Sequence, residues 1–150
     1  MVLIISTVIW DNVFAHSYYP EFLHENEQKI MLDGKYYSHD LMLEKALNFI
    51  DENAQKPFFL YFSPTIPHAD LDIMGEAMTE YEGEFCETPF GGSRDGYKSQ
   101  QNPRAAYAAM VTYLDKSVGL IIKELKEKGL YDHTIIVFTS DNGVHSEGGH

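Results

Sequence analysis

The sequence predicts an α/β fold, in which a mostly parallel sheet is flanked by helices. Two apolar runs of strand length, residues 58–62 and 134–139, contain no charged side chain. Such runs are typical of strands that are covered on both faces, as in a parallel sheet. The clearest helical pattern of the chain lies between them. A strand, a crossover with a helix and a second strand form a βαβ unit, whose connection we expect to be right-handed.

Composition limits the class of protein. The 150 residues fit one domain and suffice for a hydrophobic core. The net charge of −12 argues against nucleic-acid binding, which needs clustered Lys and Arg, and we interpret the acidic surface as a source of solubility. Cys86 is the single cysteine, so an internal disulfide framework is excluded.

The first ten residues are mostly apolar, and they have three interpretations. A secretory signal peptide needs a positively charged start, but no Lys or Arg precedes Lys29. The run is too short to span a membrane, and we expect no membrane span. The simplest interpretation is a buried strand; the third depends on a family resemblance described below.

The first elements after this run are a hairpin and a helix. Asp33-Gly34 is typical of a type I′ turn and predicts a hairpin between residues 28–32 and 35–37. Ser38 is then expected to cap a helix that continues through Asn53, before Pro57 ends the element.

Two irregular segments precede the main helix. Residues 63–68 contain two prolines and should form a loop after the first strand, and residues 69–101 have a weak pattern that predicts a long surface excursion. Asn102 as N-cap and Pro103 at the first turn then open the helix, and Gly129 ends it. Its apolar stripe comprises Ala106, Met110, Tyr113, Leu114, Val118, Ile121 and Leu125.

Ligands of open α/β sheets bind outside the carboxyl ends of the strands, and two polar loops, residues 64–68 and 140–150, are expected there. Asp141 and Asn142 offer adjacent hard oxygen donors, which suit Ca²⁺ or Mg²⁺, and Gly143 lets the backbone turn away. The same three residues also make ordinary turns, so the motif by itself leaves ligand and turn open.

Three histidines and the cysteine are further candidate site residues. His145 and His150 with Asp141 suggest zinc, but their spacing matches no standard zinc pattern, so they are solvated residues or donors to an anionic substrate. His68 can donate to an oxyanion or protonate a leaving group, or it is a loop histidine without a function. Cys86 has acidic neighbours, which disfavour a reactive thiolate.

Three segments, in this order, are similar to motifs of the type I sulfatases, including arylsulfatases and N-acetylgalactosamine-6-sulfatases. They are KPFFLYFSPTIPH at 56–68, AAYAAMVTYLD at 105–115 followed by Val118-Gly119, and IIVFTSDNG at 135–143. Residues 18–20 and 37–40 also resemble bacterial members. The resemblance covers residues 15–150.

The resemblance implies an alkaline-phosphatase-like α/β fold and hydrolysis of sulfate esters by a formylglycine nucleophile, made from Cys or Ser in a Cys/Ser-x-Pro-x-Arg motif. It implies that Asp141 and Asn142 are ligands of a divalent ion, Ca²⁺ or Mg²⁺, and that His68 contacts the substrate sulfate. His145 and His150 remain further candidates for substrate binding. The implied substrates are sulfated carbohydrates or aryl sulfates, and the implied location of the full-length enzyme is periplasmic or secreted.

The sequence departs from the family pattern at the nucleophile. Cys86 is followed by Glu-Thr-Pro-Phe, so the formylglycine motif is absent at this position. We expect that motif and two further metal aspartates upstream, and a catalytic lysine beyond His150. Residues 1–150 would then be a partial catalytic domain that is inactive by itself and self-associates.

Residues 1–14 depart as well, and we expect them to be an out-of-frame or non-native N-terminus. Relatives carry a peptide such as GFDYFYGYL there, and codons can be chosen for residues 1–10 that encode it when read two nucleotides later. The alternatives for the whole chain are a phosphodiester or phosphonate hydrolase of the same superfold, and a non-catalytic stranded fragment or binding module.

Overall fold

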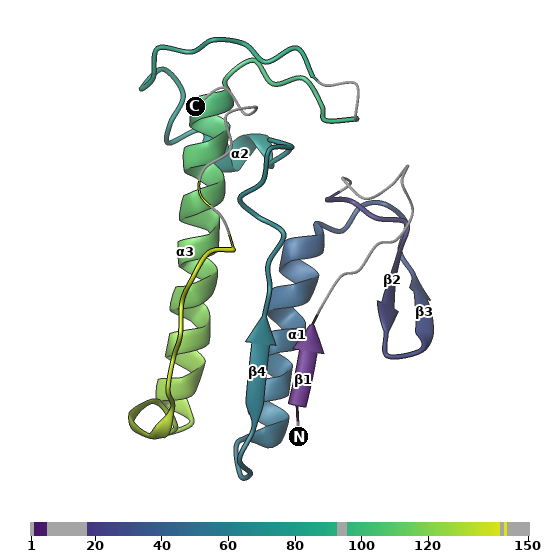
Figure 1. Ribbon diagram of the computed structural model, residues 1–150, viewed down its shortest axis with the longest axis vertical. Coiled ribbons are helices and arrows are strands. Elements are labelled where there is room, and N and C mark those ends of the chain that lie inside the picture. Colours follow the sequence, from purple (N-terminus) through teal and green to yellow (C-terminus); the bar gives the residue numbers. More distant parts are fainter. Residues whose placement is uncertain (1, 6–17, 93–95, 142, 144–150) are drawn as a thin grey trace. The chain divides into compact units, whose positions relative to one another are not determined.

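The computed structural model describes residues 2–5, 18–92, 96–141 and 143 (Figure 1). The chain divides into two compact units, which are described separately. The first comprises Met1–Pro64 and Leu120–Tyr131, and the second comprises Thr65–Gly119 and Asp132–His150.

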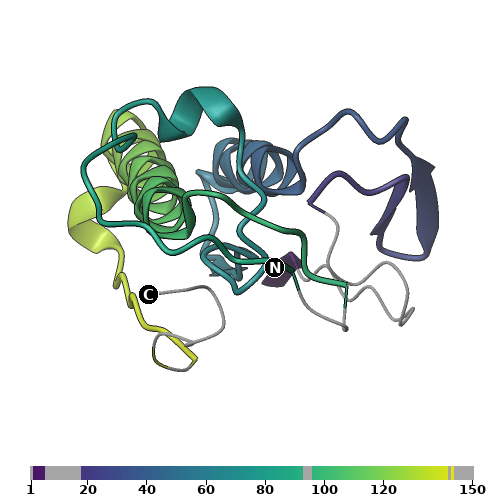
Figure 2. The same ribbon diagram turned by 90° about the horizontal axis from the view of Figure 1, so that it is seen from above.

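The first unit has a parallel pair of strands with a helix packed against it. β1, Val2–Ile5, pairs in parallel with β4, Phe59–Phe62, so that Val2 lies beside Phe59. α1, Ser38–Asn53, contacts both strands and lies alongside them (Figures 1 and 2). The predicted α/β class with parallel strands is therefore confirmed.

Apolar side chains of α1 form the core of this unit. Its buried positions recur at helical spacing and include Met42, Ala46, Phe49 and Ile50. Phe49 meets the ring of Phe58 edge to face, with ring centroids 5.6 Å apart. This periodic apolar face explains why α1 was predictable as a helix.

An aromatic cluster lies at the start of α1. The ring of Tyr37 lies 5.7 Å from that of Tyr18 and 6.4 Å from the imidazole of His39, which in turn lies 6.1 Å from Phe62 on β4. The Ser38 N–H donates to the Tyr18 carbonyl at 2.7 Å. His39 is fully buried in this cluster.

The predicted hairpin and cap of this region are wrong in detail. The hairpin consists of β2, Phe22–Glu25, and β3, Gln28–Met31, and turns at Asn26, whose φ is +56°. Asparagine adopts this left-handed conformation more readily than most residues, so Asn26 competes with the Asp33-Gly34 signal. The chain turns at Gly34 too, with φ +70°, but it then enters α1, whose N-cap is Tyr37 without a side-chain cap.

The second predicted strand is also wrong. After the short turn η1, Tyr131–His133, residues 134–139 form no strand in the described part of the chain. Ile135, Val137 and Phe138 are 92%, 80% and 71% exposed. A strand needs a neighbour for its hydrogen bonds, and the described neighbour of β4 is β1, so the βαβ unit is not formed here.

β4 itself is a strand, as predicted, but it is covered on one face rather than two. Leu60 and Phe62 are half-buried, whereas Phe59 and Tyr61 are 58% and 53% exposed. The apolar run therefore predicted the strand correctly, but the expectation that both of its faces are covered is wrong.

The second unit is mostly irregular up to its long helix. The short helix α2, Gly75–Met78, and an isolated antiparallel bridge between Phe90 and Gln100 interrupt the predicted excursion. α3, Pro103–Glu127, begins where the sequence predicted. Pro103 is buried with the small residues of the first turns, Ala105, Ala106 and Ala109.

The carboxylate of Glu87 supplies acceptors for the start of α3. It accepts the N–H groups of Arg104 and Ala105 at 3.0 and 2.9 Å, while the Asn102 carbonyl accepts the Ala106 N–H. A negatively charged carboxylate at a helix N-terminus satisfies these donors and is attracted to the positive end of the helix dipole. The last residues of α3 belong to the first unit, where Gly129, with φ +68°, follows the end of the helix as predicted.

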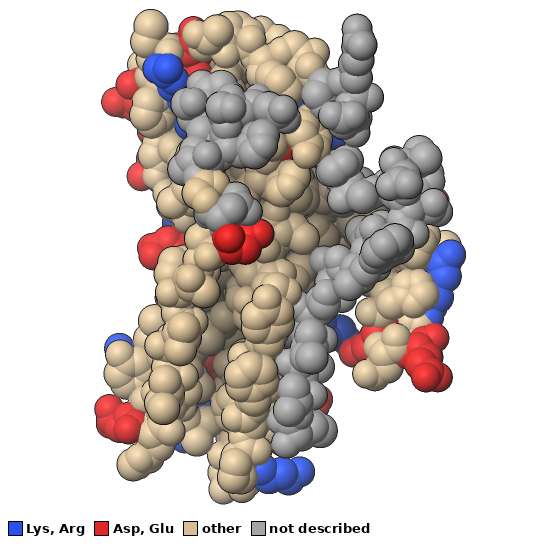
Figure 3. Space-filling view, viewed as in Figure 1, with Lys and Arg blue, Asp and Glu red and all other residues tan. Residues whose placement is uncertain are grey.

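α3 is the one described helix that is long and apolar enough to cross a membrane by length and composition. One such helix is weak evidence for a membrane span, because core helices meet the same criterion; 28% of its apolar window is buried. Figure 3 shows both acidic and basic side chains exposed among the described residues on the face that it draws.

His39 should make the stability of the chain depend on pH. Burial lowers the pKa of His39 to about 4, and nearby Asp40 partly opposes this. Above pH 6.5 the imidazole is neutral in both states, but between about pH 6.5 and 4 the unfolded chain takes up a proton that the folded chain does not. The loss should approach about 3 kcal/mol, measured by urea unfolding across this range.

His39→Gln should flatten that pH profile, because glutamine has no charge to gain. The matched control is His24→Gln, which removes an exposed histidine of β2 and should leave the profile in place. A profile that stays equally steep without His39 would contradict the assignment.

Glu87→Ala should destabilise the chain by about 1 kcal/mol, because two N–H groups at the start of α3 lose their acceptor. Glu84→Ala removes the same charge from an exposed neighbouring position and should cost much less. Thermal unfolding of both variants measures the difference, and equal losses would refute the capping contact.

Candidate functional site

His68 lies in the loop that follows β4, as the sequence predicted. Its side chain is exposed, and its Nδ1 accepts the backbone N–H of Asp70 at 3.4 Å. The imidazole meets the ring of Tyr97 edge to face, with centroids 5.7 Å apart and planes at 82°. His68 therefore presents an exposed imidazole that contacts Asp70 and Tyr97.

Hydrogen bonds connect the His68 loop to the segment before α3. The Asp70 side chain is 1% exposed, and its Oδ1 accepts the Lys98 N–H at 2.9 Å. The Gln100 amide donates to the Leu71 carbonyl at 3.0 Å. Lys98 also forms an ion pair with Asp72. These bonds fix residues 69–72 against residues 97–100.

The contacts of His68 define what it can do chemically. A neutral imidazole whose Nδ1 accepts a hydrogen bond carries its proton on Nε2. Nε2 is then a donor, and a donor at the protein surface can bind an anionic oxygen or stabilise one that gains charge. The geometry suits the predicted contact with an oxyanion.

The predicted metal ligands are only partly within the described structure. Asp141 is exposed, whereas Asn142, His145 and His150 lie outside the described residues. Within the part of the chain that the structure describes, no group of three or more His, Cys, Asp or Glu side chains is arranged to hold a metal ion. Asp141 and Asn142 supply the oxygen ligands that a hard cation prefers. Two donors are fewer than the six to eight oxygens that Ca²⁺ takes.

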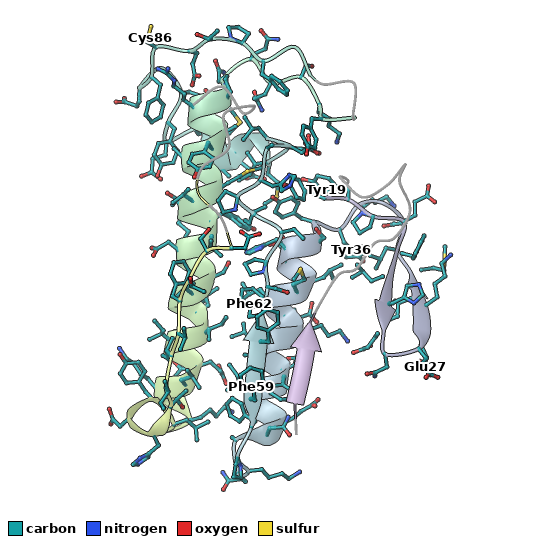
Figure 4. All side chains as sticks on the ribbon, in the orientation of Figure 1. Tyr19, Glu27, Tyr36, Phe59, Phe62 and Cys86 are labelled. Carbon is teal, nitrogen blue, oxygen red and sulfur yellow. The ribbon has the colours of Figure 1, made fainter. Side chains whose placement is uncertain are left out.

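Cys86 lies on an exposed stretch of the excursion (Figure 4). The Arg104 guanidinium donates to its backbone carbonyl at 3.0 Å, and the neighbouring Glu87 carboxylate is occupied by the start of α3. These contacts involve the backbone of Cys86 and assign no chemical function to its thiol.

The sequence did not predict the contacts of Asp70 and Tyr97 with His68, or the hydrogen bond from Gln100 to the neighbouring loop. Asp70 and Lys98 are 28 residues apart, and the segment between them has no periodic pattern that could have predicted the contact. The burial of Asp70 points to its structural role, but this burial is seen only in the structure.

Known proteins of one family are similar to this chain. The profile of the family described as Sulfatase matches residues 5–150. The chain is 31% identical over 128 residues to YdeN, an uncharacterized sulfatase of Escherichia coli (strain K12), covering 84% of this chain and 20% of YdeN. It is 31% identical over 105 residues to the N-acetylgalactosamine-6-sulfatase of Homo sapiens, covering 69% of this chain and 16% of that protein.

A solved structure is similar as well. Ps i-CgsB in complex with k-i-k-neocarrahexaose superimposes with a TM-score of 0.58 at 27% identity, over 74% of this chain and 21% of that one. The likeness supports the predicted alkaline-phosphatase-like α/β fold. The chain spans about a fifth of the length of these relatives. By the family profile and these identities, the chain belongs to the sulfatase family.

Proposed function

We propose that this chain is part of the catalytic domain of a sulfatase that hydrolyses sulfate esters of carbohydrates, and that His68 contacts the substrate sulfate. One observation carries the assignment of His68. Its exposed imidazole accepts the Asp70 N–H at Nδ1, so Nε2 is the nitrogen that donates. A sulfate monoester is an anion, and a fixed N–H donor stabilises the charge that grows on its oxygens during cleavage.

The names of relatives support a carbohydrate substrate. One relative is an N-acetylgalactosamine-6-sulfatase, and the similar solved structure is a complex with k-i-k-neocarrahexaose. Aryl sulfates are the second class of substrate we propose.

The full reaction needs groups that this sequence does not contain. It has no Cys/Ser-x-Pro-x-Arg motif from which formylglycine is made. A divalent ion, when bound, would polarise the sulfate oxygens as a Lewis acid, and Asp141 and Asn142 would supply two of its oxygen ligands. We therefore propose that the 150-residue chain has no sulfatase activity of its own.

A phosphodiester or phosphonate hydrolase is the alternative within the same superfold, and the fold does not choose between them. Family membership favours the sulfate ester. A periplasmic or secreted location is part of the proposal for the full-length enzyme. The non-native origin of residues 1–14 stays a prediction, which sequencing the coding DNA tests.

The proposed metal contribution predicts weak binding. Titration of the 150-residue chain with Ca²⁺ should give a dissociation constant above about 1 mM, because two donors fall short of the six to eight oxygens that Ca²⁺ takes. The same preparation should not release sulfate from an aryl sulfate. Tight binding that survives Asp141→Ala would place the ion elsewhere, and measurable turnover would contradict the inactive state.

The proposed function of His68 is tested in an enzyme that carries this segment together with a formylglycine motif. His68→Ala should lower kcat/KM for a sulfate ester about 100-fold or more, since one donor to the developing charge is lost. His24→Ala, on β2, is the control and should leave kcat/KM unchanged. Unchanged turnover in His68→Ala, or a preference for phosphate esters in the parent enzyme, would refute the proposal.

The exposed segment 134–139 supports self-association of the chain. Ile135 and Val137, at 92% and 80% exposed, are apolar side chains on a backbone segment without strand partners among the described residues. The double substitution Ile135→Lys and Val137→Lys should shift the chain from oligomers to monomers in sedimentation velocity. Ser99→Lys with Gln101→Lys adds the same charge at exposed polar positions and should not; a monomeric parent chain would contradict the proposal.

A further inference from the structure

We propose that two copies of this chain form a dimer by strand exchange, in which residues 134–139 of each copy, the exchange segment, pair with β4 of the other copy at the edge opposite β1. The inference rests on the proposed self-association of the chain and deepens it, because it names the surface that receives the exposed segment. It is independent of the proposed contact of His68 with a sulfate.

The exchange segment has the composition of a strand, yet it pairs with none of the strands that the structure describes. Between its two threonines lie four apolar side chains, and all four are exposed. They are β-branched or aromatic, which are the types that favour strands. A soluble monomer rarely exposes a continuous apolar stretch of this kind, so the segment marks an interaction surface.

β4 offers the matching surface in the other compact unit. Among the residues that the structure describes, β1 is the one strand that pairs with β4, so the opposite edge of β4 is available to a further strand. Phe59 and Tyr61 are more than half exposed, whereas the alternate residues Leu60 and Phe62 are half-buried (Figure 4). A strand added at this edge would extend both of these faces.

The side chains of the two surfaces complement each other. Ile135 and Val137 share one face of a strand, because side chains alternate along it. In the dimer they lie beside the rings of Phe59 and Tyr61 of the other copy, and pairs of β-branched and aromatic residues stabilise neighbouring strands. Backbone hydrogen bonds between the two strands add to these contacts.

A second copy is the partner that satisfies both surfaces at once. Each copy carries one exchange segment and one β4, so a reciprocal exchange pairs two segments with two edges and closes about a twofold axis. The charge of the chain favours the same surfaces. Two copies with a net charge of −12 each repel one another, but residues 58–62 and 134–139 contain no charged side chain.

The repulsion gives the dimer a salt dependence of defined sign. The Debye length falls from about 30 Å at 0.01 M salt to about 3 Å at 1 M. Raising NaCl over this range should lower the dissociation constant of the dimer about tenfold or more, measured by sedimentation velocity. A dimer that weakens as salt rises would be held by ion pairs and would contradict the proposal.

Disulfide trapping between two copies tests the contact itself, after Cys86→Ser has removed the native exposed thiol. One copy carries Tyr61→Cys and the other carries Val137→Cys, both at exposed positions. Opposite residues of paired strands lie at a distance that a disulfide spans. The mixed disulfide should form about 100-fold faster than between unpaired thiols, because pairing raises their effective concentration. Ile135→Cys covers a register shifted by two residues.

Val111→Cys is the matched control for Val137→Cys, because it places a thiol at an exposed valine of α3. It should form no accelerated disulfide with Tyr61→Cys. A further variant carries Tyr61→Cys and Val137→Cys in one chain, and we expect it to give a covalent dimer. A monomer with an intramolecular disulfide would show that the segment pairs with β4 of its own chain, and this would overturn the proposal.

The combined outcomes separate this inference from the proposals on which it rests. A dimer that strengthens with salt and forms the mixed disulfide supports strand exchange. A monomeric parent chain would refute both self-association and the exchange. Oligomers without the mixed disulfide, or oligomers that keep growing with concentration, would refute the exchange and leave self-association standing. Turnover by the His68 variants enters none of these measurements, so the sulfatase proposal stands or fails separately.

Discussion

The hydrogen bond between the buried carboxylate of Asp70 and the backbone of Lys98 supports the order of the segment between β4 and α3. Apart from α2 and one isolated bridge, this segment has no described helix or strand to satisfy its backbone groups. Buried N–H and carbonyl groups still need partners. Polar side chains supply them: Asp70 accepts from Lys98, Gln100 donates to Leu71, and Glu87 accepts from the start of α3. Hydrogen bonds from side chains thus satisfy backbone groups here, as hydrogen bonds between strands do in a sheet.

Both units bury apolar side chains, but they combine this burial with different backbone arrangements. The first is held by the apolar face of α1 against a pair of parallel strands, where burial is distributed over many side chains. The second also buries apolar side chains, among them Ile66, Leu71, Ile73 and Met78, and before α3 it adds hydrogen bonds between distant parts of the chain. His68 belongs to this second kind of structure. A loop fixed by specific polar contacts can hold one side chain in a defined direction while leaving it accessible to a substrate.

The sequence predicted those elements whose signal is local. α3 begins at Pro103 as expected, and α1 begins at Ser38, one residue before the predicted start, because an apolar face at helical spacing is a local property of the sequence. Residues 134–139 had an equally strong apolar signal, yet they form no described strand. A strand is completed by a neighbour, and no local pattern says where that neighbour is. The position of the hairpin was predicted wrongly because Asn26 and Gly34 both permit a left-handed turn. The pairing of Phe22 with Met31 places the hairpin turn at Asn26.

The candidate site divides in the same way. A short motif suffices to place His68 after a strand, and the N–H of Asp70, two residues away, already selects the nitrogen that donates. The partners that hold this arrangement, Tyr97 and Lys98, lie far along the chain and have no motif. A cation site is more demanding still, because two adjacent oxygen donors at 141 and 142 supply only a minority of the ligands that a hard ion takes. A short motif can therefore identify the residue that meets the substrate, whereas the rigidity of that residue and the completeness of a metal shell are properties of contacts between distant segments.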